Sequence, residues 1–279
     1  MTTLQELQTV RWETPAAGVA RIVLNRPETR NAQSKRLLYE LNQALDAAAH
    51  DDAVKVVILA ADGPHFSSGH DLRDETEMSE FDRVTPWGGF DDPGFEGYFA
   101  QEQELYLGLC WRWRDLPKPT IAQVHGRVIA AGLMLVWPCD LIVASEDAEF
   151  SDPVVALGAN GVEYFAHPFE LGARKAKQML FTGAPISAAE AHALGMVNEV
   201  VAREELEVAT LELAERIARR PSFALRLAKL TVNQSLDIQG LRSSIEAAFG
   251  YHHLGHAHNV QQHGILVDPA GVETIRRGE

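Results

Sequence analysis

The sequence predicts an α/β fold, and two features of its hydrophobic pattern lead to this prediction. Short apolar runs rich in β-branched residues recur along the first half of the chain and end at glycine, proline or a polar turn, as buried strands do. They occupy residues 18–25, 54–60, 120–126 and 140–144. The segments between them carry apolar residues at helical spacing. Because strands alternate with helices, we expect parallel strand pairing with helical crossovers.

The first predicted helix covers residues 31–48, where leucines and alanines recur every three or four positions. Residues 73–97 are rich in charges, glycines and aromatics without clean periodicity, so we expect a loop with short helical pieces there. A second helix is predicted over residues 101–114. Residues 128–138, rich in Ala, Leu and Met, predict a buried helix.

The strand signal fades after Gly172. Helical patterns cover residues 173–181, the segment opened by the capping box at Ser187, residues 200–219 and residues 222–233, with Pro221 as a break. We expect a core over residues 1–200 and a helical C-terminal region over residues 201–279.

Composition excludes several functional classes. The 279 residues carry a formal net charge of −14, which opposes nonspecific binding to nucleic-acid phosphates. Cys110 and Cys139 are too few for a disulfide scaffold and lack metal-ligand spacing. We find no basic, apolar start and no apolar run approaching 18 residues, so we expect a cytosolic protein without a membrane span.

Two segments share a feature that suits anion binding. At residues 64–72 and 125–133 a strand leads into a turn of small residues where a helix begins. The first N–H groups of a helix have no intrahelical partner. One such turn is ordinary helix packing, but two that face each other would form an oxyanion site.

Five segments in order resemble the successive motifs of the crotonase superfamily, the enoyl-CoA hydratase/isomerase family. They read LNRPETRNA, HFSSGHDL, PKPTIAQVHGRVIAAG, WPCDLIVASEDAEFSDP and KAKQMLFTGAPISAAEAHALGMVNEVV, within residues 19–201. The resemblance implies a spiral of ββα units, a C-terminal helical region that mediates trimer formation, and a homotrimer or dimer of trimers. It also implies an acyl-CoA thioester substrate and no cofactor other than that CoA.

The same resemblance assigns the two oxyanion donors to the backbone N–H groups of His70 and Ala131. The family usually has alanine at the first place and a triple glycine at the second. Because a helical first turn does not require positive φ, we expect Ala130 and Ala131 to be tolerated. The His70 imidazole is either a bystander or a group that titrates near neutrality and meets the substrate.

The resemblance also implies a CoA-binding region. The backbone of Ser68, Asp71 and Leu72 would lie near the adenine, while Arg26 and Arg30 would flank the pantetheine and phosphates. Both arginines also fit an ordinary surface position.

One departure from the family pattern bears on the reaction. Hydratases of the family hold the added water with two glutamates, whose places are taken here by Met134 and Val154. Neither side chain transfers a proton, so the sequence disfavours standard hydration and favours an isomerase- or lyase-type reaction.

Glu163 is the candidate replacement. Dienoyl-CoA isomerase-like and dehalogenase-like members place a working aspartate within one residue of Val162. In an apolar pocket we expect desolvation to raise the pKa of Glu163. The alternative is that Glu163 caps the following helix or pairs with Arg174 or Lys175. Asp152 ranks second as the replacement carboxylate.

A cluster of histidines lies near the C-terminus, at His252, His253, His256, His258 and His263. We expect no metal there, because no carboxylate or cysteine occurs at ligand spacing and Gly250 and Gly255 weaken the helix. The histidines could instead line the acyl end of the pocket.

Two functional hypotheses follow. The first is an acyl-CoA enzyme that stabilises a thioester enolate in a backbone oxyanion hole. The alternative is a non-catalytic acyl-CoA-binding relative that kept the turns and lost the acid/base pair.

Overall fold

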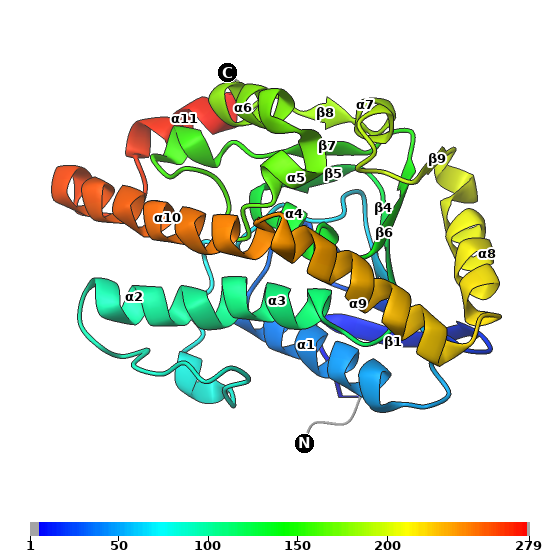
Figure 1. Cartoon of the computed structure of the whole chain (residues 1–279). Coiled ribbons are helices and arrows are strands. Elements are labelled where there is room, and N and C mark those ends of the chain that lie inside the picture. The colour runs from blue at the N-terminus through cyan, green and yellow to red at the C-terminus, as the bar shows by residue number, and fades with distance from the viewer. Residues whose placement is uncertain (1–5, 278–279) are drawn as a thin grey trace.

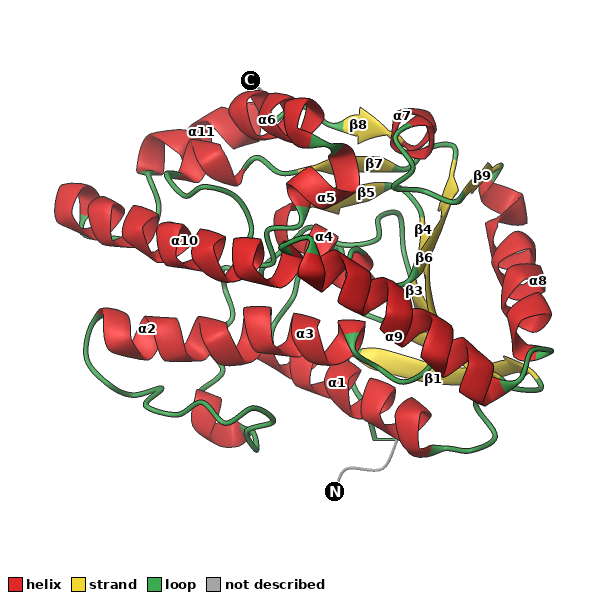
Figure 2. Cartoon of the chain, viewed as in Figure 1, coloured by secondary structure: helices red, strands yellow, loops and turns green. Residues whose placement is uncertain are grey.

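The computed structural model describes residues 6–277 and confirms the α/β fold. Its main sheet has the strand order β1-β2-β3-β4-β6-β9, in which β1 is antiparallel to β2 and the other neighbours are parallel (Figures 1 and 2). The strands are β1 (Val10–Ala16), β2 (Val19–Leu24), β3 (Val56–Ala61), β4 (Thr120–Val124), β6 (Leu141–Ser145) and β9 (Glu199–Val201). A smaller sheet contains β5 (Arg127–Ile129), β7 (Glu149–Ser151) and β8 (Ile186–Ser187). The four expected strands are present, whereas β1 was not predicted.

Both faces of the main sheet are buried, which explains why its strands read as continuous apolar runs. Ile22 and Leu24 pack in one core with the leucines of α1 (Lys35–His50). Val19 and Val23 point to the opposite face and pack in a second core with α8 (Leu206–Ala218). The alternation follows from the two-residue period of a strand.

The helix predicted over residues 101–114 starts earlier, and its helix type changes from α to π and back to α. It runs as α2 (Phe95–Glu102), a π-helical segment η3 (Gln103–Gly108) and α3 (Leu109–Arg114). A single π-helical turn is rare and often lies at a functional site. The preceding loop contains only the short 3-10 turn η2 (Met78–Glu80), as expected for residues 73–97.

The buried helix predicted over residues 128–138 is wrong in its first part. The chain there forms β5, then the 3-10 turn η4 (Ala130–Gly132), and only then the short helix α4 (Leu133–Val136). Val128 is fully buried and pairs with Phe150 of β7, so tertiary contacts override the helical composition.

Helices dominate the rest of the chain, as expected, but the helix predicted over residues 200–219 starts only at Leu206, because Glu199–Val201 pair with β6 as β9. The helices are α5 (His167–Leu171), α6 (Ala173–Thr182), α7 (Ala188–Ala193), α8, α9 (Ser222–Ile238), α10 (Leu241–His263) and α11 (Pro269–Arg277). Short 3-10 turns are η1 (Pro27–Thr29), η5 (Val154–Leu157) and η6 (Arg203–Glu205). Ser187 caps α7 by accepting a hydrogen bond from the Glu190 N–H, which confirms half of the predicted capping box.

The expectation that Gly250 and Gly255 break the C-terminal helix is wrong. The helix α10 spans 23 residues without interruption and lies alongside α2 (Figure 1). At Gly255 a Cβ would come within 2.6 Å of the Gly158 carbonyl oxygen, so glycine permits close packing there. Across residues 6–277, every helix is either too short or too polar to cross a bilayer.

Candidate active site

The two small-residue turns lie against each other, as the sequence predicts. Ser67 and Val128 form a parallel bridge, in which the Ser67 N–H donates to Arg127 O at 3.2 Å and the Ile129 N–H donates to Ser67 O at 3.0 Å. The approach is close enough to require glycine at position 69. A Cβ there would lie 2.9 Å from the Ile129 oxygen, and the φ angle of Gly69 is +90°.

Gln33, which the sequence did not single out, joins the two turns. Its backbone N–H donates to Gly69 O at 2.8 Å, and its side-chain Nε2 donates to Ala131 O at 2.7 Å. In the parallel bridge between Gln33 and the first turn, the Asp71 N–H donates to Gln33 O. The His70 N–H forms no hydrogen bond in this bridge. Ala131 is the second residue of η4, where a helical N–H lacks an intrahelical partner. The two amides assigned as oxyanion donors therefore lie in adjoining turns.

The expected backbone geometry is wrong at one position of the second turn. Ala130 has a φ of +49°, in the left-handed region that glycine adopts at no steric cost. Glycine would adopt this conformation freely, whereas Ala130 adopts it under strain.

Glu163 and His70 form a close pair of titratable side chains, with Glu163 buried and His70 half-buried. Nε2 of His70 lies 3.0 Å from Oε1 of Glu163, whose side chain is 4% exposed. The Tyr106 ring, from the π-helical segment, packs on the His70 ring with centroids 3.9 Å apart. Residues far apart in the sequence thus converge on one point.

The structural alternatives for Glu163 are not realised. Lys175 pairs with Glu190 at 2.5 Å, and within residues 6–277 no ion pair joins Glu163 to Arg174. The N-terminus of α5 receives no side-chain cap. Glu163 instead faces His70 and also Nε2 of His252, at 3.6 Å.

The expected electrostatics of Glu163 is wrong in sign. Burial alone would raise the pKa of Glu163, but attraction to His70 and His252 outweighs it and lowers that pKa below its ordinary value. The converse holds for His70, where burial is opposed by Glu163 and the pKa of the imidazole is raised. Glu163 is therefore ionised at neutral pH, which is the protonation state that a base requires.

Asp152, the second candidate, is committed to holding the loop that carries Glu163. It is fully buried and accepts hydrogen bonds from the Val162 N–H at 3.0 Å and from His167 Nε2 at 2.8 Å. The two places of the hydratase glutamates are apolar, as the sequence indicates: Met134 is buried and Val154 half-buried.

The five residues assigned to CoA binding lie together beside the first turn. Arg26 contacts Asp71 at 2.9 Å, and Ser68 N–H donates to Arg30 O at 3.0 Å. Arg30 is exposed, and Leu72 is 81% exposed. Arg26 is thus tied to the turn, whereas Arg30 occupies a solvent-facing position.

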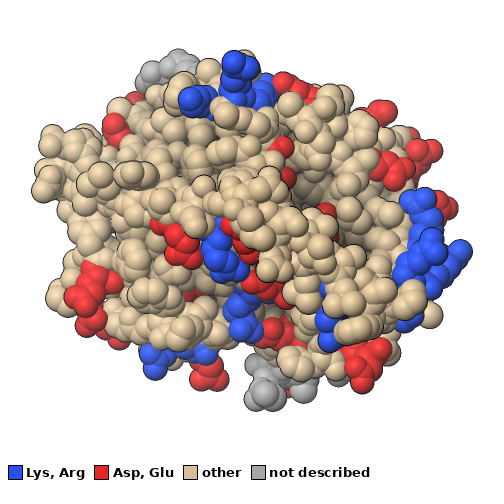
Figure 3. Space-filling model, viewed as in Figure 1, with Lys and Arg blue, Asp and Glu red and all other residues tan. Residues whose placement is uncertain are grey.

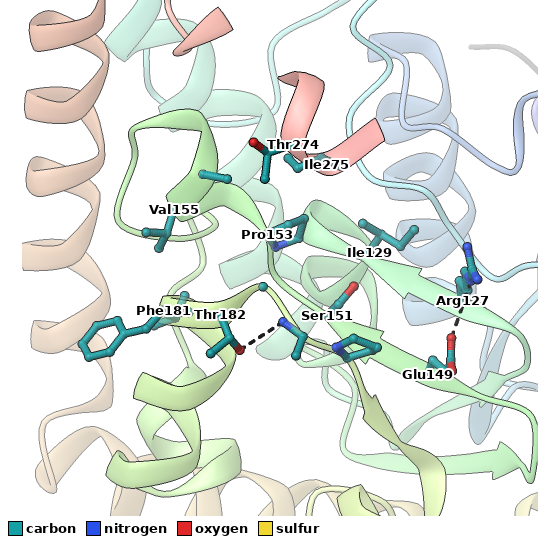
Figure 4. Close-up of a pocket in the computed structure, with 15 residues that line it drawn as sticks. Arg127, Ile129, Glu149, Ser151, Pro153, Val155, Phe181, Thr182, Thr274 and Ile275 are labelled. Atoms are coloured by element: carbon teal, nitrogen blue, oxygen red, sulfur yellow. Dashed lines mark hydrogen bonds and ion pairs between the residues drawn. The ribbon is translucent and has the colours of Figure 1, made fainter. Parts of the chain in front are cut away.

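A hollow of about 720 Å³ lies elsewhere, between the small sheet, α6 and α11 (Figure 4). Ile129 and Pro153 line it, and Arg127 faces Glu149 across 3.5 Å at its edge. Neither His70 nor Glu163 lines this hollow, so the chemical groups described above are separate from it.

Three C-terminal histidines do meet a carboxylate, contrary to the sequence-based expectation. Glu102, at the end of α2, lies within 3.2 to 3.8 Å of Nε2 of His252, His253 and His256. Spacing along the chain could not reveal this cluster, because about 150 residues separate the carboxylate from the histidines.

The fold and the paired helix-start turns define a class of protein, the crotonase-type α/β proteins, and comparison with known proteins agrees. The family model described as enoyl-CoA hydratase/isomerase matches residues 14–267. The chain therefore belongs to the enoyl-CoA hydratase/isomerase family, which acts on acyl-CoA thioesters.

Individual relatives are consistent with this. EchA13 of Mycobacterium tuberculosis, which carries the name of an enoyl-CoA hydratase, is 48% identical over 262 residues, covering 91% of this chain and 82% of EchA13. The crystal structure of a probable enoyl-CoA hydratase from Mycobacterium smegmatis has a TM-score of 0.84 and 49% identity, covering 93% of this chain and 99% of that one. A monofunctional enoyl-CoA isomerase from M. smegmatis has a TM-score of 0.64 and 28% identity, covering 82% and 94%.

Proposed function

We propose that the chain is an acyl-CoA enzyme of isomerase or lyase type, in which Glu163 moves the proton and the amides of His70 and Ala131 stabilise the thioester enolate. The observation that supports this most directly is the 3.0 Å contact between Glu163 Oε1 and His70 Nε2. In this contact Glu163 meets the same residue whose amide is the first proposed oxyanion donor.

The chemistry follows from these positions. The Glu163 carboxylate removes a proton from the α-carbon of a 3-enoyl thioester, and the C–H electron pair shifts toward the thioester oxygen. One oxyanion-hole donor contributes about 3 kcal/mol to the stability of such an anion. The protonated Glu163 then returns the proton to the γ-carbon, so that the double bond moves and no other reactant is consumed. A single base is sufficient for this isomerisation.

The proposal gives the His70 side chain a positioning role. Burial alone would raise the pKa of Glu163, and the nearby His70 imidazole, whose own pKa is raised by Glu163, lowers it. The packing of Tyr106 on the imidazole ring restricts its orientation.

We also propose that the chain assembles as a homotrimer or a dimer of trimers. Support comes from apolar side chains on α9, where Phe223 is 69% exposed and Val232 is 60% exposed. Few charged side chains cover the neighbouring α10 (Figure 3). Light scattering on the purified protein tests the mass. Both cysteines are free, which fits the proposed reducing cytosol.

The experiment that tests the function is a panel of 2-enoyl, 3-enoyl and saturated acyl-CoA thioesters, assayed for binding by thermal shift and for turnover by chromatography. The proposal expects a rise in Tm with the thioesters and interconversion of 2- and 3-enoyl isomers. Binding of every thioester without conversion of any would instead support the non-catalytic alternative.

A further inference from the structure

Glu102, His252 and His256 form a group whose geometry suits a metal ion better than a hydrogen-bond network. One donor atom from each side chain lies within 4.8 Å of the others. His252 and His256 are four residues apart on α10, so their rings project from the same face of the helix. Glu102 comes from the end of α2, which lies beside α10 (Figure 1).

The backbone determines which nitrogen of each ring carries hydrogen. Nδ1 of His252 lies 2.8 Å from Gly161 O, and Nδ1 of His256 lies 2.8 Å from Leu266 O. Because a carbonyl oxygen only accepts, both Nδ1 atoms carry the hydrogen. In the neutral rings Nε2 then presents a lone pair, and both Nε2 atoms face Glu102. Metal-binding histidines commonly show this arrangement, in which the second nitrogen donates to a backbone carbonyl.

The distances from Glu102 to the two proposed ligand rings are too long for hydrogen bonds. Nε2 of His252 lies 3.8 Å from Glu102 Oε2, and Nε2 of His256 lies 3.6 Å from Glu102 Oε1. Nε2 of His253, 3.2 Å from Glu102 Oε2, also has no hydrogen-bond partner within residues 6–277. Ligands about 2.1 Å from a tetrahedral zinc ion are about 3.4 Å apart, close to the distances seen here.

Burial makes the lack of partners significant. The His252 side chain is 4% exposed. Within residues 6–277, neither its Nε2 nor Oε2 of Glu102 has a hydrogen-bond partner. Unpaired polar atoms are costly in such a place, and a cation between them would satisfy both.

We propose that Glu102, His252 and His256 bind a divalent transition metal ion of the zinc type. Two imidazoles and one carboxylate suit zinc or ferrous iron rather than magnesium or calcium, which prefer oxygen ligands. Three protein ligands leave a coordination position for water or a substrate group. The inference goes beyond the proposed function and does not depend on it, although His252 Nε2 also lies 3.6 Å from Glu163 Oε1. The metal would thus adjoin the pair of Glu163 and His70.

Zinc titration of the full-length protein tests the proposal. Protein dialysed against a chelator is titrated with ZnCl₂ in a calorimeter, in parallel with Glu102→Gln, His252→Ala and His256→Ala. The control is His258→Ala, an exposed histidine on the same helix. We expect one zinc per chain in the wild type and in the control. Each ligand variant should bind zinc more than about 100-fold more weakly than the wild type. This loss is larger than that caused by substituting residues that only support the metal ligands.

Circular dichroism and metal-free Tm values show which variants remain folded. Should a ligand variant not fold, the absorption spectrum of the Co²⁺-loaded wild type decides, because a tetrahedral nitrogen and oxygen site gives intense visible bands and surface-bound cobalt does not. Absence of stoichiometric zinc and of these bands overturns the proposal. So does zinc affinity that falls in His258→Ala but not in the folded ligand variants.

Discussion

The side-chain amide of Gln33 donates a 2.7 Å hydrogen bond to the carbonyl of Ala131, 98 residues further along the chain. This bond ties the start of α1 to the second small-residue turn, while the Gln33 backbone holds the first turn at Gly69. The relative position of the two proposed donors therefore depends on one buried glutamine.

We expect Gln33→Leu to lower both stability and turnover. Leaving the buried Ala131 carbonyl unpaired typically costs about 1–3 kcal/mol. The misplaced donor should lower kcat more than it raises KM, since the enolate forms only during the reaction. The control is Gln239→Leu, which removes an amide-to-carbonyl bond on an exposed helix end and should be nearly neutral. Equal effects of the two substitutions on unfolding and kcat would contradict this role for Gln33.

In the second turn, a glycine substitution should affect stability in opposite directions at the adjacent positions Ala130 and Ala131. Ala130 has a φ of +49°, so Ala130→Gly should leave stability unchanged or raise it by up to about 1 kcal/mol. Ala131 lies in a 3-10 turn and has no such strain, so Ala131→Gly should destabilise by about 0.5–1 kcal/mol. Urea denaturation of the wild type and both variants measures their stabilities. An Ala130→Gly variant less stable than the wild type would show that the substitution does not relieve the strain.

Glu170, on α5, gives the chain a predicted pH dependence. Burial raises the pKa of Glu170 from 4.5 to about 7. Between those values the unfolded chain loses this proton while the folded chain keeps it, so the stability linked to Glu170 is present below pH 4.5 and is lost as pH rises through about 7. The limit is about 1.4 kcal/mol per pH unit, reduced by partial exposure of the side chain.

Glu170→Gln should remove this dependence. The free energy of unfolding of the variant minus that of the wild type should be larger at pH 8 than at pH 5. Chemical denaturation at the two pH values measures the difference, and a wild-type-minus-variant difference that does not change with pH would contradict the shifted pKa.

Hydration of crotonyl-CoA should be slow in the wild type. Met134 and Val154 occupy the places of the two water-holding glutamates, and loss of general acid/base assistance costs about 10² to 10⁴-fold. The double variant Met134→Glu with Val154→Glu should hydrate faster if it folds, although two carboxylates in an apolar site oppose folding. A wild-type rate equal to that of an ordinary hydratase assayed alongside would show that other residues activate water.

The sequence predicts the main features of the fold because the evidence for them is local. The runs at residues 18–25 and 54–60 are apolar on both faces, and the structure buries both faces in β2 and β3. The segment at residues 128–138 could not be predicted in the same way, because Val128 pairs with Phe150 of β7, a strand further along the chain.

The candidate site shows the same limit. Glu163 and His70 could be named from motifs, but their 3.0 Å contact joins residues 93 positions apart. The direction of the pKa shift of Glu163 depends on that contact and on His252, so apolar composition alone led to the wrong sign. Glu102 and Gln33 lie in segments whose local pattern indicates only a helix and a helix start.

The central claim is that Glu163 transfers the proton, and kcat of Glu163→Gln on the best thioester of the panel tests it most directly. Glutamine keeps the size and the hydrogen bonding of the side chain but cannot accept the proton. We predict that kcat falls by about two to four powers of ten while the affinity for the acyl-CoA stays within a few-fold of wild type. Glu170→Gln serves as the matched control and should retain kcat. A folded Glu163→Gln protein with wild-type kcat would contradict the account.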